Sequence, residues 1–422
     1  MDLTLLIFLV VYVAMGAGKI PGFMVDRTGA AIVGALAMLA TGAITSAKAW
    51  DAIDYHALGM LFGLMVVSAA FVASGFYGWA ARRVATLPVS PPLLLAVLIA
   101  VGGVLSAFLT NDVVVVAMTP LLVSVTLARG LNPVPFLLAF CFAANTGSSG
   151  TLIGSPQNMI IAEGLGLSFN GFLGVTAIPA LLSLPVVWAT LVLVYRGRWS
   201  VSAVALTDDP AKGAKQAAPE PDSGPAVLDI PETVKAGAVT LLVILAFVFG
   251  DWPRDLIALT AAGFLLINRK IASADMLKHV DGNLLLLIMG LFVVNAGMAA
   301  TGLPQTLLAE LRGAGFNLEN PLVLFVVGGT LSNIVGNNPA VMLLVPFLHA
   351  GENADALGAA LALGTGFSSN LIVFGSLAGI IVVEQAARCG VRISFGEFAR
   401  AGVPVTVVTV LLAAGWILTL GH

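Results

Sequence analysis

The chain carries the same membrane-type sequence twice, and this internal duplication constrains the fold more than any single motif. The segment VGGVLS at 101–106 returns as VGGTLS at 327–332. In both copies a polar pair follows after four further residues, Asn111-Asp112 in the first and Asn337-Asn338 in the second. Duplication over a whole chain is typical of secondary transporters, in which the transport site lies where the two halves meet.

The duplication continues upstream and downstream of these pairs. Asp54 matches Asp281 and Gly63 matches Gly290, so one offset of 227 residues holds through this region. Downstream, further matched pairs follow: Ser148-Ser149 with Ser368-Ser369, Gly154-Ser155 with Gly375-Ser376, Glu163 with Glu384, and Pro179 with Pro404. The two copies therefore cover nearly the entire chain.

Composition places the chain in a membrane. Hydrophobic residues make up 59% and charged residues 10%, against roughly 25% charged residues in soluble domains. The apolar start, Met1 to Gly18, has no basic region and no cleavage site of small residues, so we interpret it as the first span and not as a signal peptide. The two cysteines, Cys141 and Cys389, form neither a disulfide framework nor a metal-binding set.

Hydropathy at about 20 residues per span predicts the same order of segments in both halves. The first half has segments at 3–23, 29–47, 57–77, 91–128, 133–162 and 171–195. The second half has segments at 234–250, 254–268, 283–301, 321–350, 354–387 and 399–420. We therefore predict two membrane repeats, 1–195 and 236–422, joined by a polar, proline-rich cytoplasmic linker at 196–235.

The long segment 91–128 is either two spans or a re-entrant hairpin whose tip, at Asn111-Asp112, lies near the bilayer midplane. Irregular backbone is tolerated at that depth where it lines a cavity. With either alternative each half crosses the membrane an odd number of times, so the halves have opposite orientations. We predict an all-α polytopic membrane protein, an inverted-topology repeat whose halves each have about five spanning helices, one re-entrant helical hairpin and one broken helix.

Basic residues give an independent prediction of orientation. With re-entrant hairpins, 16 of the 19 lysines and arginines lie on the side of the linker, and only Lys48, Arg254 and Arg312 lie on the other. The positive-inside rule then puts the linker in the cytoplasm. We expect a multi-pass protein of the bacterial inner membrane with both termini on the periplasmic or outer side.

The polar residues of the membrane segments concentrate at the hairpin tips and at two interruptions, 145–158 and 364–376. Each glycine costs a helix about 1 kcal/mol and each proline about 3 kcal/mol relative to alanine, so helices break there. The N-terminal ends of the resulting half-helices favour anions, and freed carbonyls favour cations such as Na⁺. The alternative is that these small residues only allow close helix packing. The predicted substrate-binding residues are Thr110, Asn111, Asn145, Thr146, Ser148, Ser149, Thr151, Asn337, Asn338, Ser368, Ser369 and Asn370.

Asp112 is the one acidic side chain predicted deep in the membrane, where a carboxylate costs about 3 kcal/mol. We predict that it couples transport to an ion, by exchanging a proton or by ligating Na⁺; the alternative is a helix cap for the second hairpin helix. The matched residues Glu163 and Glu384 are expected near opposite membrane faces, as gates or as ordinary solvated residues. The histidines have no metal spacing, and no metal site is predicted.

Three motifs resemble signatures of the ion transporter superfamily: Thr110-Asn111-Asp112-Val113, the stretch GTLIGSPQN at 150–158, and Ser369-Asn370-Leu371 followed by GSLA at 375–378. The resemblance is to the family of ArsB arsenite permeases, NhaD-type Na⁺/H⁺ antiporters and P-protein-like and YbiR-like permeases, and more distantly to divalent-anion and citrate symporters. It implies a scaffold and a transport domain that contains the hairpins and broken helices and moves to alternate access.

We therefore predict a secondary transporter of an inorganic oxyanion or metalloid, of the arsenite and antimonite efflux type, driven by an ion gradient and most simply by protons. The alternatives are a Na⁺/H⁺ antiporter of the NhaD type and a Na⁺- or H⁺-coupled carboxylate or citrate symporter. A channel would use the same repeat passively, and only saturable, gradient-coupled flux separates the two classes. The residue constellation of an intramembrane hydrolase is absent from the sequence, so no enzyme is predicted.

The expected partners are the lipid bilayer and a small inorganic solute or anion. A homodimer, and for an arsenite pump a partner ATPase, are further options, and no nucleic-acid partner is expected. No cofactor is predicted beyond a bound Na⁺ or H⁺ as the coupling ion.

Overall fold

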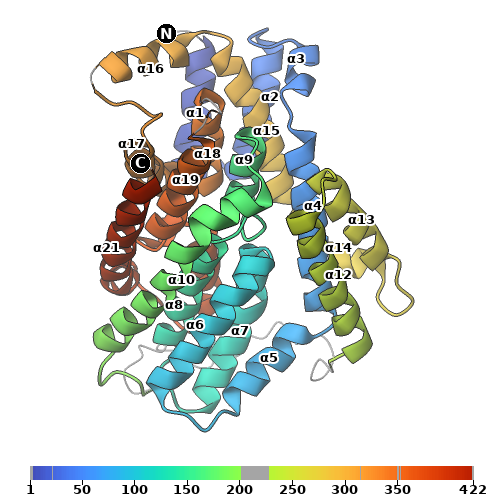
Figure 1. Ribbon diagram of the computed structural model, residues 1–422, viewed down its shortest axis with the longest axis vertical. Coiled ribbons are helices and arrows are strands. Elements are labelled where there is room, and N and C mark those ends of the chain that lie inside the picture. The colour runs from blue at the N-terminus through green and yellow to red at the C-terminus, as the bar shows by residue number, and fades with distance from the viewer. Residues whose placement is uncertain are drawn as a thin grey trace.

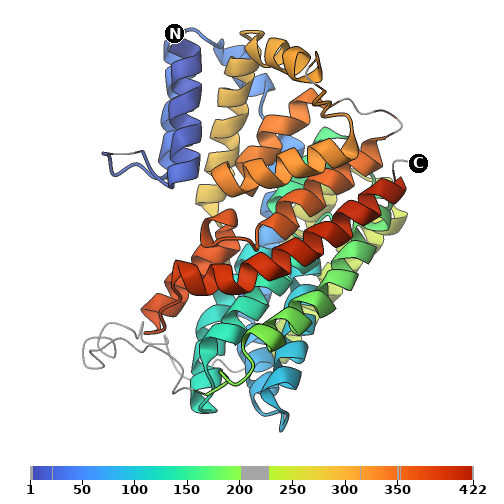
Figure 2. The same ribbon diagram turned by 90° about the vertical axis from the view of Figure 1, so that its left-hand side faces the viewer.

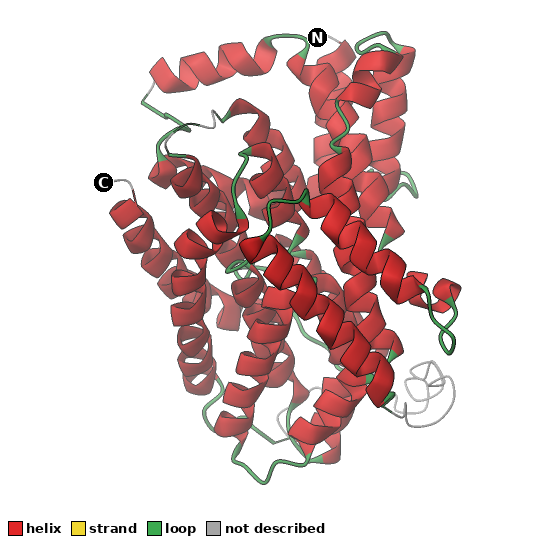
Figure 3. Cartoon of the chain, turned by 45° about the vertical axis from the view of Figure 1, so that its right-hand side comes forward, coloured by secondary structure: helices red, strands yellow, loops and turns green. Residues whose placement is uncertain are grey.

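The computed structural model describes residues 3–20, 22–200, 228–313, 315–348, 351 and 353–420. In this part of the chain the secondary structure is helical, without strands, and two isolated β-bridges join Lys19 to Asp26 and Leu131 to Ser200. Figure 3 shows the helices joined by short loops. The predicted all-α fold class is confirmed.

The first half follows the predicted order of segments. Its helices are α1 (Leu3–Ala17), α2 (Arg27–Ala40), α3 (Ser46–Asp51), α4 (Tyr55–Ala73), α5 (Phe76–Ala85), α6 (Pro91–Phe108), α7 (Asn111–Ala128), α8 (Pro133–Ser148), α9 (Pro156–Gly164) and α10 (Phe169–Val194).

The second half repeats that order. Its helices are α12 (Ile230–Phe249), α13 (Arg254–Leu266), α14 (Ser273–Leu277), α15 (Gly282–Ala299), α16 (Leu303–Gly313), α17 (Pro321–Val335), α18 (Asn337–Leu344), the 3₁₀ helix η2 (Val345–Phe347), α19 (Ala354–Ser368), the 3₁₀ helix η3 (Val373–Gly375), α20 (Leu377–Arg388) and α21 (Phe395–Leu420).

Seven of the described helices are long and apolar enough to cross a membrane, namely α4, α6, α7, α10, α12, α15 and α21. Four shorter apolar helices, α1, α2, α8 and α17, accompany them. Large apolar side chains such as Leu181, Leu242 and Leu411 are exposed on the outer surface. Exposed apolar surface of this kind is stable in lipid, so the chain is a multi-pass membrane protein.

The helices pack in two groups. The first, here called the scaffold group, comprises α1, α2, α4, α12, α13 and α15. Its main contacts join a helix of one half to a helix of the other, because α4 packs on α13 and α2 packs on α15. The second, here called the hairpin group, comprises α6 to α10 and α17 to α21. In it, α6 packs on α8 and α17 on α19, and the long helices α10 and α21 cross the molecule side by side (Figure 2). Figure 1 shows the scaffold helices α4, α12 and α13 beside the hairpin group.

The two long hydrophobic segments, 91–128 and 321–350, each fold as a hairpin of two helices that meet at a tip. In the first half α6 ends at Phe108 and α7 begins at Asn111; in the second α17 ends at Val335 and α18 begins at Asn337. The turn at Gly336 has φ 93°, which a residue without Cβ adopts at little cost. The second helix of each hairpin packs against the half-helix of the other half, α7 on α20 and α18 on α9.

The broken spans are also observed. The first is α8, a non-helical stretch at 149–155, and α9; the second is α19, a stretch at 369–376 that includes η3, and α20. The glycines there permit close helix contact, because a Cβ at Gly147 would collide with the backbone of Gly103 on α6. Small residues at these positions therefore serve packing as well as the breaks.

Two pairs of short helices were not predicted from the sequence. The matched pair α5 and α16 links the scaffold group to the hairpins in each half, and the matched pair α3 and α14 precedes α4 and α15. Helix α5 is amphipathic, with Arg82 and Arg83 in its last turn. Such helices are shorter and more polar than the roughly 20 apolar residues that a membrane span needs, so hydropathy alone does not predict them.

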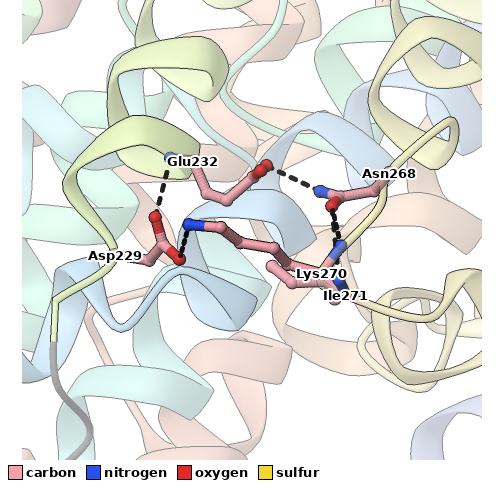
Figure 4. A network of polar contacts seen from close by, with 5 residues as sticks. All are labelled: Asp229, Glu232, Asn268, Lys270 and Ile271. Atoms are coloured by element: carbon pink, nitrogen blue, oxygen red, sulfur yellow. Dashed lines mark hydrogen bonds and ion pairs between the residues drawn. The ribbon is translucent and has the colours of Figure 1, made fainter.

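The predicted linker, 196–235, lies largely outside the described residues, which stop at 200 and resume at 228. Where the chain resumes, the amide of Asp229 donates to the carbonyl of Ser74 at 3.0 Å, which places the start of α12 beside the end of α4. Lys270 pairs with Asp229 at 2.9 Å, and Glu232 accepts a hydrogen bond from Asn268 at 2.6 Å (Figure 4). The hydrogen bond from Lys270 lowers the pKa of Asp229. The loops predicted to share the cytoplasmic side therefore contact one another.

Candidate functional site

A cavity of about 870 Å³ lies between the scaffold group and the hairpin group. It brings together both hairpin tips, the start of α9, the start of α20, the start of α15 and the loop between α1 and α2. The two halves therefore contribute to one cavity, as the duplication predicts. Its polar and charged lining residues are Asp26, Arg27, Thr28, Asn111, Asp112, Gln157, Asp281, Asn283, Asn337, Asn338, Ser376 and Glu384.

The first tip is held by backbone and hydroxyl contacts. The amide of Asn111 donates to the carbonyl of Gly154 at 3.0 Å, which fixes the tip to the break in the next span. The amide of Thr110 donates to Ser68 Oγ on α4 at 2.9 Å, and the Thr110 hydroxyl contacts the same oxygen at 3.0 Å. Asn111 Oδ1 is buried without a hydrogen-bond partner, although Asn111 lines the cavity. A buried acceptor of this kind needs a partner.

The second tip has the same plan with different partners. Asn337 Oδ1 accepts hydrogen bonds from Ser332 on α17 and, at 3.0 Å, from Ser369 at the second break. Its neighbour Asn338 also lines the cavity, and Asn338 Oδ1 has no hydrogen-bond partner. Each tip thus has a cavity-lining asparagine whose buried amide oxygen has no hydrogen-bond partner, Asn111 Oδ1 in one half and Asn338 Oδ1 in the other.

The two breaks contact each other through buried amides. Asn145 Nδ2 donates to Asn370 Oδ1 at 3.0 Å and to Ser376 Oγ at 3.1 Å, while Asn370 Nδ2 donates to Thr146 Oγ1 at 3.3 Å. Ser376 is also the N-cap of α20, where its hydroxyl accepts from the amide of Gly379. These bonds join the halves within the hairpin group.

The structure separates the predicted site residues into two sets. Asn111, Asp112, Asn337, Asn338 and Glu384 line the cavity. The others lie outside its lining and bond mainly to protein atoms, and these are Thr110, Asn145, Thr146, Ser148, Ser149, Thr151, Ser368, Ser369 and Asn370.

Four serines of the second set form hydrogen bonds at the ends of α8 and α19. Ser148 and Ser149 both donate to the carbonyl of Asn145 on their own helix, at 3.1 and 2.7 Å. Ser368 and Ser369 repeat this toward the carbonyl of Thr365. Such bonds satisfy the hydroxyl within its own helix, so these serines stabilise the ends of α8 and α19.

Glu163 lies away from the cavity. Glu163 Oε1 pairs with Arg254 Nη2 at 3.0 Å, and both side chains are 20% exposed. Its repeat mate Glu384 is exposed at the cavity and forms no ion pair with a described residue. The two matched glutamates are therefore in different environments.

Several cavity residues were not predicted from the sequence. Arg27, Asp281 and Asp26 belong to loops or helix starts, where a span count treats charges as solvated. Gln157 is the second residue of α9 and is 4% exposed. Ser376 stands in a quoted motif, and its match to Ser155 at the other break was the signal that could have identified it.

The charges of the cavity are mainly negative. Among the described residues that line it, four are acidic, Asp26, Asp112, Asp281 and Glu384, and one is basic, Arg27. Arg27 Nε donates to the carbonyl of Met15 at 2.9 Å. Asp281 caps α15 by accepting from the amide of Leu284 at 3.0 Å. With four carboxylates against one guanidinium, the lining suits hydroxyl groups or cations more than a free multiply charged anion.

Further unpaired oxygens lie beside the breaks. Ser106 Oγ, Ser155 Oγ and Asn158 Oδ1 surround the first break, and Asn333 Oδ1 lies against Gly375 at the second. Oxygen atoms of this type are ligands for hard cations. Within the described residues, no three His, Cys, Asp or Glu side chains form a metal-binding group.

The sequence profile of the family described as "CitMHS: Citrate transporter" matches residues 8–366. The chain is 31% identical to "Uncharacterized transporter Rv2684" of Mycobacterium tuberculosis, over 97% of this chain and 96% of that protein. It is 28% identical to "Silicon efflux transporter LSI3" of Oryza sativa subsp. japonica, over 92% of each.

A similar fold occurs in the crystal structure of the YdaH transporter of Alcanivorax borkumensis, which was described as having an unusual topology. The TM-score is 0.53 at 15% sequence identity, and the match covers 99% of this chain and 97% of that chain. At this identity the likeness concerns the fold alone.

Proposed function

The chain belongs to the citrate transporter family and is a secondary transporter, and from this premise we propose that it moves a small, hydroxyl-rich, uncharged oxoacid in exchange for protons. Arsenious and silicic acids are members of this cargo class. The cargo binds between the two hairpin tips, and access to it alternates as the hairpin group moves against the scaffold group.

The observation that carries this proposal is the chemistry of the cavity lining. Asn111 Oδ1 and Asn338 Oδ1 are acceptors without partners on residues that line the cavity, and Asp112 adds two carboxylate oxygens to the same lining. A polyhydroxy acid presents O–H donors to such a lining, whereas a fully ionised oxyanion presents acceptors only. Four acidic residues around one arginine would also repel a free multiply charged anion.

A second cargo, citrate, is supported by the name of the family. Because the lining is acidic, the negative charge of citrate must then be neutralised, either by protonation of its carboxylates or by a bound divalent cation. Arg27 is the group that would pair with a remaining carboxylate. The relative named as a silicon efflux transporter, 28% identical to this chain, supports the uncharged cargo instead.

Asp112 is the proposed coupling residue. It lies at the tip of the first hairpin and lines the cavity, so it changes its surroundings whenever access to the cavity changes. The second tip carries Asn338 at the matched position, which cannot exchange a proton. Coupling at the tips is therefore asymmetric, with one titratable group per transport unit.

Na⁺ is the alternative coupling ion and is favoured by the unpaired oxygens beside both breaks. The NhaD-type antiporter function predicted as an alternative would use the same oxygens for Na⁺ as cargo. We place the protein in the bacterial inner membrane with its linker in the cytoplasm, on the basis of the basic-residue asymmetry. A homodimer, and for arsenite efflux a partner ATPase, remain part of this proposal.

Flux into proteoliposomes tests the cargo. Purified protein is reconstituted with an imposed pH gradient, and uptake of arsenite, silicic acid, and citrate with and without Mg²⁺ is compared in parallel. The proposal expects saturable, gradient-dependent uptake of an uncharged oxoacid that Asn111→Ala and Asn338→Ala both weaken. Saturable uptake of citrate alone, with no uptake of either oxoacid, would replace the first cargo by the second.

A further inference from the structure

One ion pair away from the cavity joins the two helix groups. Glu163 on α9, in the hairpin group, pairs with Arg254 on α13, in the scaffold group, at 3.0 Å. Arg254 Nη1 also donates to the carbonyl of Leu167 at 2.8 Å, so one guanidinium holds both the end of α9 and the loop after it. Glu163 and Arg254 are here called the closed-side pair.

The duplication relates each member of the closed-side pair to a residue at the cavity. Arg254 is the first residue of α13, and at the offset of 227 its mate is Arg27, the first residue of α2. Glu163 lies seven residues after Pro156, the first residue of α9, and Glu384 lies seven residues after Leu377, the first residue of α20. Arg27 and Glu384 are here called the open-side pair.

The open-side pair is separated in this state. Both residues line the cavity, and Arg27 Nε is bonded to the carbonyl of Met15. The packing differs between the halves in the same way, because α9 contacts the scaffold helix α4. Its counterpart α20 faces α15 across the cavity, which Leu284 and Leu287 line from α15 and Ile380 and Ile381 line from α20.

We infer that the two pairs exchange during transport: in the opposite access state Glu384 pairs with Arg27 and closes the present cavity, while Glu163 releases Arg254. The inference rests on the proposed alternating-access function, and it assigns to four residues a role in transport itself. Arg27 thereby acts as a gate partner and not as a permanent cargo ligand.

The charge arrangement explains why an exchange is favourable. The scaffold group carries an arginine in each pair, and the hairpin group carries a glutamate in each pair. A guanidinium and a carboxylate form a directional, charge-assisted contact when they meet. Each state then contains one formed pair and one separated pair, so the loss of one contact is offset by the gain of the other. Neither state is over-stabilised, which a transporter that visits both requires.

Charge exchange between the members of the open-side pair tests this. The single variants Arg27→Glu and Glu384→Arg place like charges together in the opposite state, and each should lower the transport rate at least about tenfold, the equivalent of about 1.4 kcal/mol. The double variant Arg27→Glu/Glu384→Arg should recover most of the rate. The matched control Arg27→Glu/Glu163→Arg combines residues that never meet, so it should stay inactive.

Recovery is informative because these two residues form no ion pair in the present state, so only an unseen state can supply the contact. Thermal stability of Glu384→Arg should remain near that of the parent, since Glu384 forms no ion pair with a described residue, whereas Arg27→Glu also loses the hydrogen bond to the carbonyl of Met15. A double variant as inactive as its parents, with stability intact, would overturn the inference.

A second measurement needs no cargo, and it separates failure of the gate from failure of the proposed function. In a Cys389→Ser background, Arg27→Cys/Glu384→Cys and Glu163→Cys/Arg254→Cys are treated with a short bifunctional thiosulfonate. We expect both pairs to cross-link in membranes, the first more slowly than the second. Cross-linking of 163/254 without any cross-linking of 27/384 would contradict the exchange, whatever the cargo is.

Discussion

Asn145 Nδ2 donates to Asn370 Oδ1 at 3.0 Å, and this contact joins the broken span of the first half to the broken span of the second. Asn370 returns a bond to the neighbouring hydroxyl of Thr146 at 3.3 Å, and all three residues are buried. Ser376, which caps α20, receives the second hydrogen bond of Asn145. The two broken spans are therefore fixed to each other, which supports a hairpin group that moves as one unit.

Removal of this contact should destabilise the protein. Asn145→Ala leaves Asn370 Oδ1 without its partner in a buried position, and an unpaired buried polar group costs about 1–3 kcal/mol. A lower melting temperature of the detergent-solubilised protein, measured by loss of the monodisperse chromatography peak on heating, is the expected result. Ser149→Ala is the control, because Ser149 Oγ bonds only within its own helix turn. Equal melting temperatures for the two variants would contradict the structural role of Asn145.

Variants at the hairpin tips should distinguish residues that bind cargo from residues that stabilise the fold. Asn111→Ala and Asn338→Ala remove amide oxygens that have no protein partner, so they should weaken cargo affinity by roughly 5- to 150-fold, the equivalent of about 1–3 kcal/mol, with little loss of stability. Asn337→Ala removes the acceptor of Ser332 and Ser369 and should lower stability as well. Equilibrium binding and thermal melting of the three purified variants check this. If Asn338→Ala binds the cargo as the parent does, the second tip lies outside the cargo site.

The orientation of the repeats can be measured directly. In the Cys389→Ser background, a cysteine at Ala387, after the cavity-lining part of α20, should react with an impermeant maleimide only from the cytoplasmic side. A cysteine at Asn317, between α16 and α17, should react only from the outside. The prediction follows from the basic-residue asymmetry and from the odd number of crossings in each half. Labelling of both positions from one side of intact cells would exclude the inverted topology.

Much of this fold could be predicted from the sequence because its breaks are encoded locally. The glycines and proline of 145–158 cannot continue a helix without cost, and the observed break lies at 149–155. The hairpins followed from an apolar segment about twice the length of a span with a polar pair near its middle. The repeat then transferred each assignment from one half to the other.

The rest depends on contacts that sequence does not record. Both Ser149 and Asn111 stand in polar interruptions of apolar sequence, yet Ser149 bonds to its own helix, whereas Asn111 lines the cavity and has a buried oxygen without a partner. Arg27 was counted with the loops, because hydropathy ends a span at a charge, and only the packing of α2 against α15 brings it to the cavity. Helices α5 and α16 were missed because their charged residues place them below the threshold for a span.

The most direct test of the account is the transport phenotype of Asp112→Asn in proteoliposomes. The amide keeps the hydrogen-bonding shape of the carboxyl group and loses its exchangeable proton, so cargo exchange at equal concentrations should persist while accumulation driven by a pH gradient disappears. Asp281→Asn is the matched control, because Asp281 lines the same cavity and asparagine also caps helices well; it should retain pH-driven accumulation. If Asp112→Asn still accumulates cargo against its gradient with the pH dependence of the parent, Asp112 does not carry the driving proton and the proposed coupling is wrong.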